Sequence, residues 1–207
     1  LKSYGAAIEE ARADLFGLYY MADPVMVELG LLPDGEAYKA QYYAYLMNGL
    51  MTQLVRIEPG ATIEEAHMRN RQLIARWVME KGKKSGNVLE WITRGGKTFL
   101  RVNDYGALRG LFGALLAEIQ RIRSTGDYAA ARAIVEQYGV QVDPGLHREV
   151  KRRYENLRLS PYKGFINPRY TPVFGPDGQT IEDVRIDYSE GYAEQMLRYS
   201  RDYSFLI

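Results

Sequence analysis

The sequence predicts a mainly α-helical domain with two small β-hairpins. Over most of the chain, apolar residues recur at alternating spacings of three and four, which is the pattern of a helix with one buried face. In two other segments, apolar and polar residues alternate on either side of a turn, as they do in β-hairpins. The two turns lie at Gly95-Gly96 and at Gly175–Gly178. No repeat with a period of about 20 to 50 residues is present, which argues against a solenoid. We therefore expect a single domain over residues 1–207, with no internal boundary.

Capping residues and prolines mark the starts of the helices in the first half of the chain. Ser3 can cap the first helix, and Thr62–Glu65 has the spacing of a capping box, which puts His67 in the second helical turn. Pro24 suits the first position of a short helix, and Pro59-Gly60 ends a longer one. The expected helices comprise residues 3–21, 24–31, 37–56 and 62–81.

The second half of the chain contains both hairpins. Gly139 is placed to end one helix, and Pro144 is placed to begin the next, which is rich in basic residues. The amphipathic pattern of a helix resumes after the second hairpin. The expected elements are a hairpin over residues 87–103, helices over 103–123, 129–139 and 144–157, a hairpin over 163–187 and a helix over 189–204.

The composition excludes several classes of partner and of site. Lys and Arg number 27 against 26 Asp and Glu, for a formal net charge of +1, and no basic stripe could follow a phosphate backbone, so nucleic acid is not expected. The longest apolar stretch, residues 106–119, is interrupted by Arg109 and is too short to cross a bilayer, so no membrane partner is expected. The chain has no Cys, which excludes disulfides and thiolate chemistry; a metal would need His, carboxylate or water ligands.

The beginning of the chain shows no targeting segment. Residue 1 is Leu, and no charged and then apolar leader precedes the first helix. Because the chain opens with Leu-Lys almost directly inside a strong helix, we expect it to be cut from a longer protein. For that protein we expect a cytoplasmic location.

The first helix carries three carboxylates within EEARAD, residues 9–14. At about 100° per residue, Glu10 and Asp14 share a face that lies opposite the apolar stripe and is otherwise built of small residues. Small residues let another backbone or a bound group come close, and carboxylates on such a face need water or a cation beside them. Two interpretations follow from this pattern. The acids are either weakly paired surface charges, or they serve metal ligation or acid–base chemistry.

The stretch YGAAIEEARADLFGLYYMAD closely resembles the second signature of the dipeptidyl peptidase III family of zinc peptidases. In that family a Glu-Glu-x-Arg-Ala-Asp/Glu helix supplies the third protein ligand to zinc. The resemblance implies that Glu10 is the zinc ligand, and that Glu9 and Asp14 support the zinc-binding His residues. Two His and one carboxylate suit a catalytic zinc, and supporting acids orient each His through its other ring nitrogen. Ala11, in the third position of the motif, suggests the bacterial branch.

The first signature of that family, a helix with His-Glu-x-x-x-His spacing, is not among these residues. In the family it furnishes two His ligands and the Glu that acts as general base. The resemblance therefore implies a C-terminal piece of the helical catalytic region of a larger metallopeptidase, with an incomplete Zn²⁺ site and no activity by itself. The whole protein is expected to release dipeptides from the N-terminus of oligopeptides, which are its expected partners.

His67 lies in a helix that the family also has. By pattern alone a packed or surface histidine is the commoner interpretation, whereas the resemblance implies a catalytic role, with the imidazole stabilising the oxyanion as water attacks the scissile carbonyl. His147, in GLHREVKRR, has no counterpart in the resemblance and is read as a surface helix residue.

The stretch SPYKGFINPRYTP, residues 160–172, resembles a family segment in which a basic pair precedes a polar-Pro dipeptide. Anchoring on Asn167-Pro168 puts Lys163 on the second basic position and Tyr162 on the first, where relatives outside this branch have Arg. Lys163 is therefore the expected substrate-binding residue. The alternative, an ordinary exposed lysine at the start of a strand, stays open.

Two other functions compete with the peptidase. One is a noncatalytic helical interaction module, whose Tyr-rich helices bind a partner. The other is a carboxylate-only Mg²⁺ enzyme acting on phosphates, which the even charge balance makes the weakest of the three. The metal content of a Glu10→Ala variant separates the peptidase from the interaction module, since an interaction module loses no metal through that change.

Overall fold

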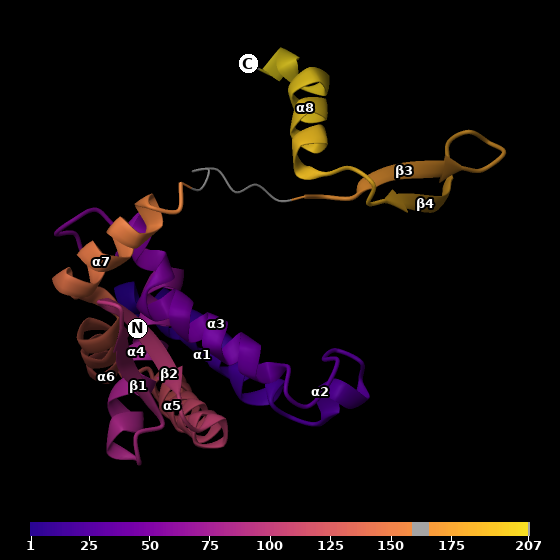
Figure 1. Ribbon diagram of the computed structural model, residues 1–207. Coiled ribbons are helices and arrows are strands. Elements are labelled where there is room, and N and C mark those ends of the chain that lie inside the picture. The colour runs from indigo at the N-terminus through magenta and orange to yellow at the C-terminus, as the bar shows by residue number, and fades with distance from the viewer. Residues whose placement is uncertain (159–165, 207) are drawn as a thin grey trace. The chain divides into compact units, whose positions relative to one another are not determined.

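The computed structural model describes residues 1–158 and 166–206, and it divides the chain into two compact units, residues 1–158 and 159–207 (Figure 1). The prediction of a mainly α-helical fold with two small antiparallel hairpins is confirmed. The expectation of a single domain over residues 1–207 stays a prediction.

The first unit contains seven α-helices, two 3₁₀ helices, one π-helical segment and one hairpin within the described residues. In chain order these elements are η1 (Lys2–Tyr4), α1 (Gly5–Met21), α2 (Val25–Glu28), α3 (Tyr38–Leu50), η2 (Thr52–Arg56), α4 (Ala66–Lys84), β1 (Leu89–Arg94), β2 (Lys97–Val102), α5 (Tyr105–Thr125), α6 (Tyr128–Val135), η3 (Glu136–Val140) and α7 (Pro144–Glu155).

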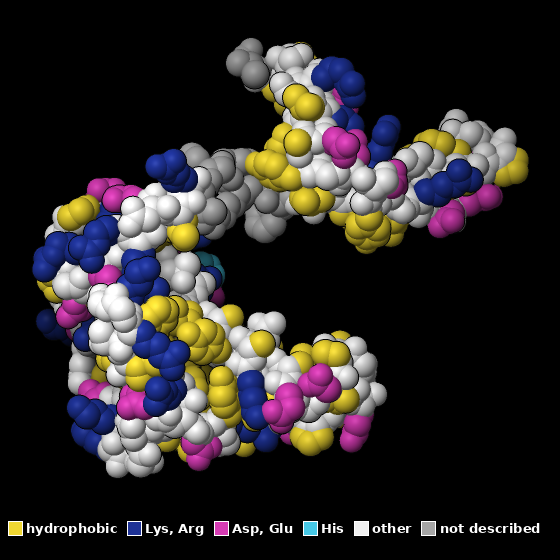
Figure 2. Space-filling view, in the orientation of Figure 1, with side chains coloured by type: hydrophobic (Ala, Val, Ile, Leu, Met, Phe, Trp, Pro, Cys, Tyr) yellow, Lys and Arg dark blue, Asp and Glu magenta, His cyan; other side chains and the backbone are white. Residues whose placement is uncertain are grey.

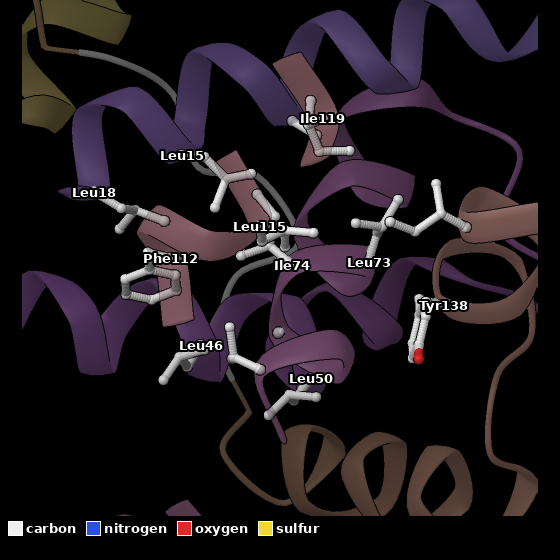
Figure 3. Packing of buried hydrophobic residues seen from close by; sticks show 14 of the residues in the cluster. Leu15, Leu18, Leu46, Leu50, Leu73, Ile74, Phe112, Leu115, Ile119 and Tyr138 are labelled. Carbon is white, nitrogen blue, oxygen red and sulfur yellow. The ribbon is translucent and has the colours of Figure 1, made fainter. Parts of the chain in front are cut away.

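Helix α4 lies at the centre of this unit, where it contacts α1, α3, α5 and η3. Figure 3 shows the labelled side chains of these elements pointing into one common core. The apolar stripe expected for the first helix is fully or almost fully buried there, and Phe112 of α5 packs edge-on against Tyr42 of α3. The buried stripe of α1 consists of Ile8, Ala11, Leu15 and Leu18.

Two glycines let other backbones approach α4 closely. A Cβ on Gly49 of α3 would lie far inside van der Waals distance of the Arg71 carbonyl oxygen, and a Cβ on Gly139 would lie 2.9 Å from the Arg69 carbonyl oxygen. Gly139 was expected to end a helix. Instead, a π-helical segment, η3, continues through it to Val140, and the glycine lets this segment approach α4 closely.

The starts of two helices differ from the sequence prediction. Ser3 caps nothing, since α1 begins after Tyr4, and no side chain caps it. Helix α4 begins after Glu65, whose carboxylate accepts hydrogen bonds from the backbone N–H groups of His67 and Met68 at 2.8 and 3.0 Å. The preceding Ile63 is held in place instead by a backbone hydrogen bond to Val140. His67 therefore lies in the first turn of α4 and not in the second.

The long helix expected over residues 37–56 is divided in two. Helix α3 ends at Leu50, Met51 leaves the helical conformation with φ of −134°, and a 3₁₀ helix follows. The buried side chain of Gln53 donates hydrogen bonds to the carbonyl oxygens of Gly49 and Met68. This contact joins the end of α3 to the first turns of α4.

The hairpin β1–β2 is confirmed, and a carboxylate on α7 holds it in place. Glu149 accepts hydrogen bonds from the backbone N–H and the hydroxyl of Thr98 at 2.8 and 2.7 Å, and Arg153 donates to Glu149 and to the Thr98 carbonyl oxygen. The bonds from Thr98, followed by the one from Arg153, hold the pKa of Glu149 below its ordinary value. The carboxylate is thus better stabilised in the folded chain than in the unfolded one.

We expect Glu149→Gln to lower the free energy of unfolding by about 1 kcal/mol at neutral pH. Because the folded pKa is the depressed one, this contribution is complete above the ordinary Glu pKa of 4.5 and disappears as the pH falls through the lower, folded value. Urea unfolding of the wild type and the variant at several pH values measures the difference. A difference that persists unchanged at the acid end would contradict the electrostatic origin.

The interpretation of His147 as a surface residue is wrong. Its side chain is buried, and its Nε2 atom lies 3.1 Å from the Ile57 carbonyl oxygen, to which Lys151 also donates. The amphipathic helix α7 turns His147 and Val150 inward together, so this imidazole anchors α7 to the loop that follows η2.

The second unit has a hairpin followed by a helix, as predicted. Its elements are β3 (Arg169–Phe174), β4 (Ile181–Asp187), α8 (Tyr192–Asp202) and η4 (Ser204–Leu206), with β3 and β4 antiparallel. The buried Gln195 of α8 exchanges hydrogen bonds with the backbone N–H and carbonyl of Asn167. Lys163 lies outside the described residues, so its expected role in substrate binding stays a prediction.

The surface of the first unit carries both signs of charge. Figure 2 shows Lys and Arg side chains interspersed with Asp and Glu over its visible face, with hydrophobic side chains among them. In the part of the chain that the structure describes, no helix combines the length and the apolar composition that crossing a membrane requires.

Candidate metal and catalytic site

The structure brings together two side chains that the sequence singled out separately. Glu10 on α1 and His67 in the first turn of α4 are in contact, with 3.0 Å between Glu10 Oε2 and His67 Nδ1. The two side chains are 37% and 56% exposed, so both can be reached by a ligand. A pair this exposed contributes only about 0–1 kcal/mol to stability. The contact therefore orients the two groups more than it holds the fold together.

The surrounding helices determine the position of this pair. The buried stripe of α1 packs against α4 and α5, which leaves Glu10 at the edge of the α1–α4 contact. The cap by Glu65 fixes the backbone of the first turn of α4 and therefore the place of the His67 Cα atom. The N-terminal end of a helix carries a partial positive charge, which favours a carboxylate such as that of Glu10 beside it.

Asp14 lies one turn after Glu10 on the same face of α1 and is held from two other helices. Its Oδ2 atom accepts hydrogen bonds from the Tyr45 hydroxyl of α3 at 2.8 Å and from Asn70 Nδ2 of α4 at 2.9 Å. Burial, with the Asp14 charge adding to it, raises the pKa of Tyr45 well above its ordinary value. The phenol consequently stays protonated and able to donate.

Tyr45 and Asn70 were not identified from the sequence. Asn70 follows His67 by three residues, so the two share a face of α4, and this spacing is the one local signal that could have drawn attention to it. Tyr45 belongs to the Tyr-rich third helix, in which nothing in the sequence distinguishes one tyrosine from its neighbours. Their common partner on α1 becomes visible only in the folded chain.

Glu9 faces a different part of the molecule. Its carboxylate accepts hydrogen bonds from Arg12, on the next turn of α1, and from Arg123 of α5 at 3.0 Å. Arg12, followed by Arg123, lowers the pKa of Glu9. The structure thus brings Glu10 into contact with His67, leaves Asp14 one turn further along α1, and pairs Glu9 with two arginines. The role of Glu9 as a supporting acid stays a prediction.

The donors in this chain fit a metal site only in part. Among the described residues, no group of three or more His, Cys, Asp or Glu could hold a metal ion. Catalytic zinc takes three protein ligands and a water, and a Glu oxygen is one of the accepted ligands. The partly exposed carboxylate of Glu10 is suited to be one such ligand, and the half-buried Asp14 beside it is suited to orient another.

The helical unit that carries this site belongs to a peptidase family. The model for Peptidase family M49 matches residues 1–159, which include every residue of the candidate site. Because that match covers well over half of the chain, the chain belongs to peptidase family M49.

Individual relatives are mammalian dipeptidyl peptidases. The chain is 29% identical to Dipeptidyl peptidase 3 of Homo sapiens over 187 residues, which is 86% of this chain and 25% of the human protein. It is also 29% identical to Dipeptidyl peptidase 3 of Mus musculus over 147 residues, which is 67% of this chain and 20% of the mouse protein. The chain therefore spans a fifth to a quarter of the length of these relatives.

Proposed function

We propose that this chain is the part of a zinc-dependent dipeptidyl peptidase that contributes Glu10 to the metal and His67 to the reacting centre. The other zinc ligands would come from polypeptide outside these residues. The observation that carries the proposal is the 3.0 Å contact between Glu10 and His67, which joins a candidate metal ligand to a candidate catalytic imidazole across the α1–α4 boundary. Membership of peptidase family M49 and the names of the relatives support the same reaction.

The residues of this chain have separate tasks in the proposed reaction. When bound, zinc polarises the scissile carbonyl and activates a water molecule. Glu10 would hold the metal from α1, and Asp14 would accept a hydrogen bond from a zinc-ligating imidazole and so fix the orientation of that ring. The contact of His67 Nδ1 with Glu10 would leave Nε2 to face the developing oxyanion and stabilise it. The substrate is an oligopeptide with a free N-terminus, and the product is a dipeptide.

The full-length protein that contains this chain is expected to release intact dipeptides from dipeptidyl-arylamides and from short peptides. A chelator should abolish the release and added Zn²⁺ should restore it, because without the metal the carbonyl and the water are not activated. Mass spectrometry of the products, before and after chelation, makes the measurement.

Two outcomes would count against this function. Release of single amino acids would indicate a different peptidase, and full activity after complete removal of metal would exclude a zinc mechanism. A noncatalytic interaction module predicts no dipeptide release at all and no change in metal content on Glu10→Ala.

A further inference from the structure

We propose that Tyr45 and Asn70 are positioning residues for the metal site, which act by locking the Asp14 carboxylate in one orientation. This inference rests on the proposed function, and it assigns to α3 and α4 a task that the family motif on α1 does not contain. The carboxylate so held would present its other oxygen, Oδ1, to the imidazole of a zinc ligand.

Both hydrogen bonds to Asp14 end on the same oxygen atom. The Tyr45 hydroxyl and Asn70 Nδ2 converge on Oδ2 at 2.8 and 2.9 Å, from two different helices. A carboxylate offers acceptor sites on both of its oxygens. Two donors on Oδ2 hold that oxygen against α3 and α4, and neither of them takes up an acceptor site of Oδ1.

The two donors are themselves rigid. Asn70 is fully buried and Tyr45 is partly buried against the hydrophobic core, so neighbouring side chains restrict both rotamers. The orientation of the Asn70 amide is assigned by chemistry, because a carboxylate can only accept, and the NH₂ group must therefore face Asp14. Asn70 Oδ1 is buried and has no hydrogen-bond partner among the described residues. The buried Asn70 amide therefore holds the Asp14 carboxylate in one position.

The hydrogen bonds to Asp14 also link the two helices that carry the site. Asp14 follows Glu10 by one turn on α1, and Asn70 follows His67 by one turn on α4. The Asp14–Asn70 hydrogen bond therefore holds the same two helices in register that carry the candidate metal ligand and the candidate catalytic imidazole. Any rotation of α4 about its axis moves Asn70 and His67 together relative to Glu10.

A pair of matched variants in the full-length protein tests whether the Tyr45 hydroxyl positions the Asp14 carboxylate. Tyr45→Phe removes the hydroxyl that contacts Asp14, and Tyr42→Phe removes a buried hydroxyl from the same helix that donates to the Leu18 carbonyl oxygen of α1 at 2.7 Å. Both lose one α3–α1 hydrogen bond, but only the first touches a carboxylate. We expect Tyr45→Phe to raise the zinc dissociation constant about 10- to 100-fold, as loss of an orienting contact does at other metal sites, and Tyr42→Phe to leave it unchanged.

Asn70→Asp is the second variant, because it keeps the shape of the side chain and sets a carboxylate against Asp14. It should weaken zinc binding at least as much as Tyr45→Phe does, whereas Asn156→Asp, at the exposed end of α7, adds the same charge without effect. Thermal unfolding of the metal-free proteins reports any general loss of stability separately.

The possible results distinguish this inference from the proposed function. A wild-type protein that holds no zinc overturns the proposed function and this inference with it. A wild-type protein that holds zinc, together with a Tyr45→Phe variant that holds it as tightly, overturns the inference alone. Equal weakening by Tyr42→Phe also overturns it, since the effect would then come from helix packing and not from the carboxylate.

Discussion

Replacement of Gly49 by alanine is expected to lower the free energy of unfolding by about 3 kcal/mol, at the upper end of what overpacking usually costs. The added Cβ would meet the Arg71 carbonyl oxygen and, at 3.0 Å, the Cβ of Ala75. Both belong to the backbone face of α4, which cannot move aside as the tip of a flexible side chain can. Helix α3 would have to separate from α4, and the core shared by the two helices would lose contact.

The sign of this effect is the informative part. Alanine is normally a better helix former than glycine by about 1 kcal/mol. Replacing a glycine inside a helix by alanine would therefore ordinarily stabilise the protein. Gly110 of α5 provides the control, because it is exposed and a Cβ there meets nothing within 4 Å. Denaturant unfolding should show Gly110→Ala stabilised and Gly49→Ala destabilised. Stabilisation of both would show that α3 and α4 are not in the close contact described.

The second large effect concerns His67. In the full-length protein, His67→Gln is expected to reduce kcat by about 10²–10³-fold, as loss of a donor to a developing oxyanion does. The zinc content should stay at the wild-type level, because His67 contacts the proposed ligand Glu10 and is not itself proposed to bind the metal. Steady-state kinetics on a dipeptidyl-arylamide, combined with metal analysis of the same preparation, makes the measurement.

The other histidine is the control for this experiment. His147 is buried and contacts the Ile57 carbonyl oxygen, so His147→Gln should lower stability by about 1 kcal/mol and leave kcat close to that of the wild type. A His67→Gln variant that keeps its full kcat would remove His67 from the reaction.

Local pattern was enough to predict most of the elements. The buried stripe of α1 and both hairpins depend on periodicity and turn residues that lie within a few positions of one another, and the structure has them as expected. The boundaries that were wrong depend on distant contacts. Ile63 pairs with Val140 and delays the start of α4, and Gly139 packs on α4, so that its helical segment does not stop there.

The candidate site was predictable in a more limited way. The spacing of Glu10 and Asp14 showed that they share a helix face, but the pattern alone left surface charges and metal ligation both open. The resemblance to a peptidase family supplied the assignment, and the contact between Glu10 and His67 appears only once α1 packs against α4. Tyr45 and Asn70 could not be predicted, because two hydrogen bonds that join three helices leave no periodic pattern in the sequence of any one of them.

The zinc content of a Glu10→Gln variant of the full-length protein tests the central claim most directly. Elemental analysis after dialysis should find about one zinc ion per chain in the wild type and in a Glu28→Gln control, where an exposed glutamate of α2 is neutralised in the same way. The Glu10→Gln protein should be folded and free of zinc. A folded Glu10→Gln protein that retains the wild-type zinc content would contradict the account.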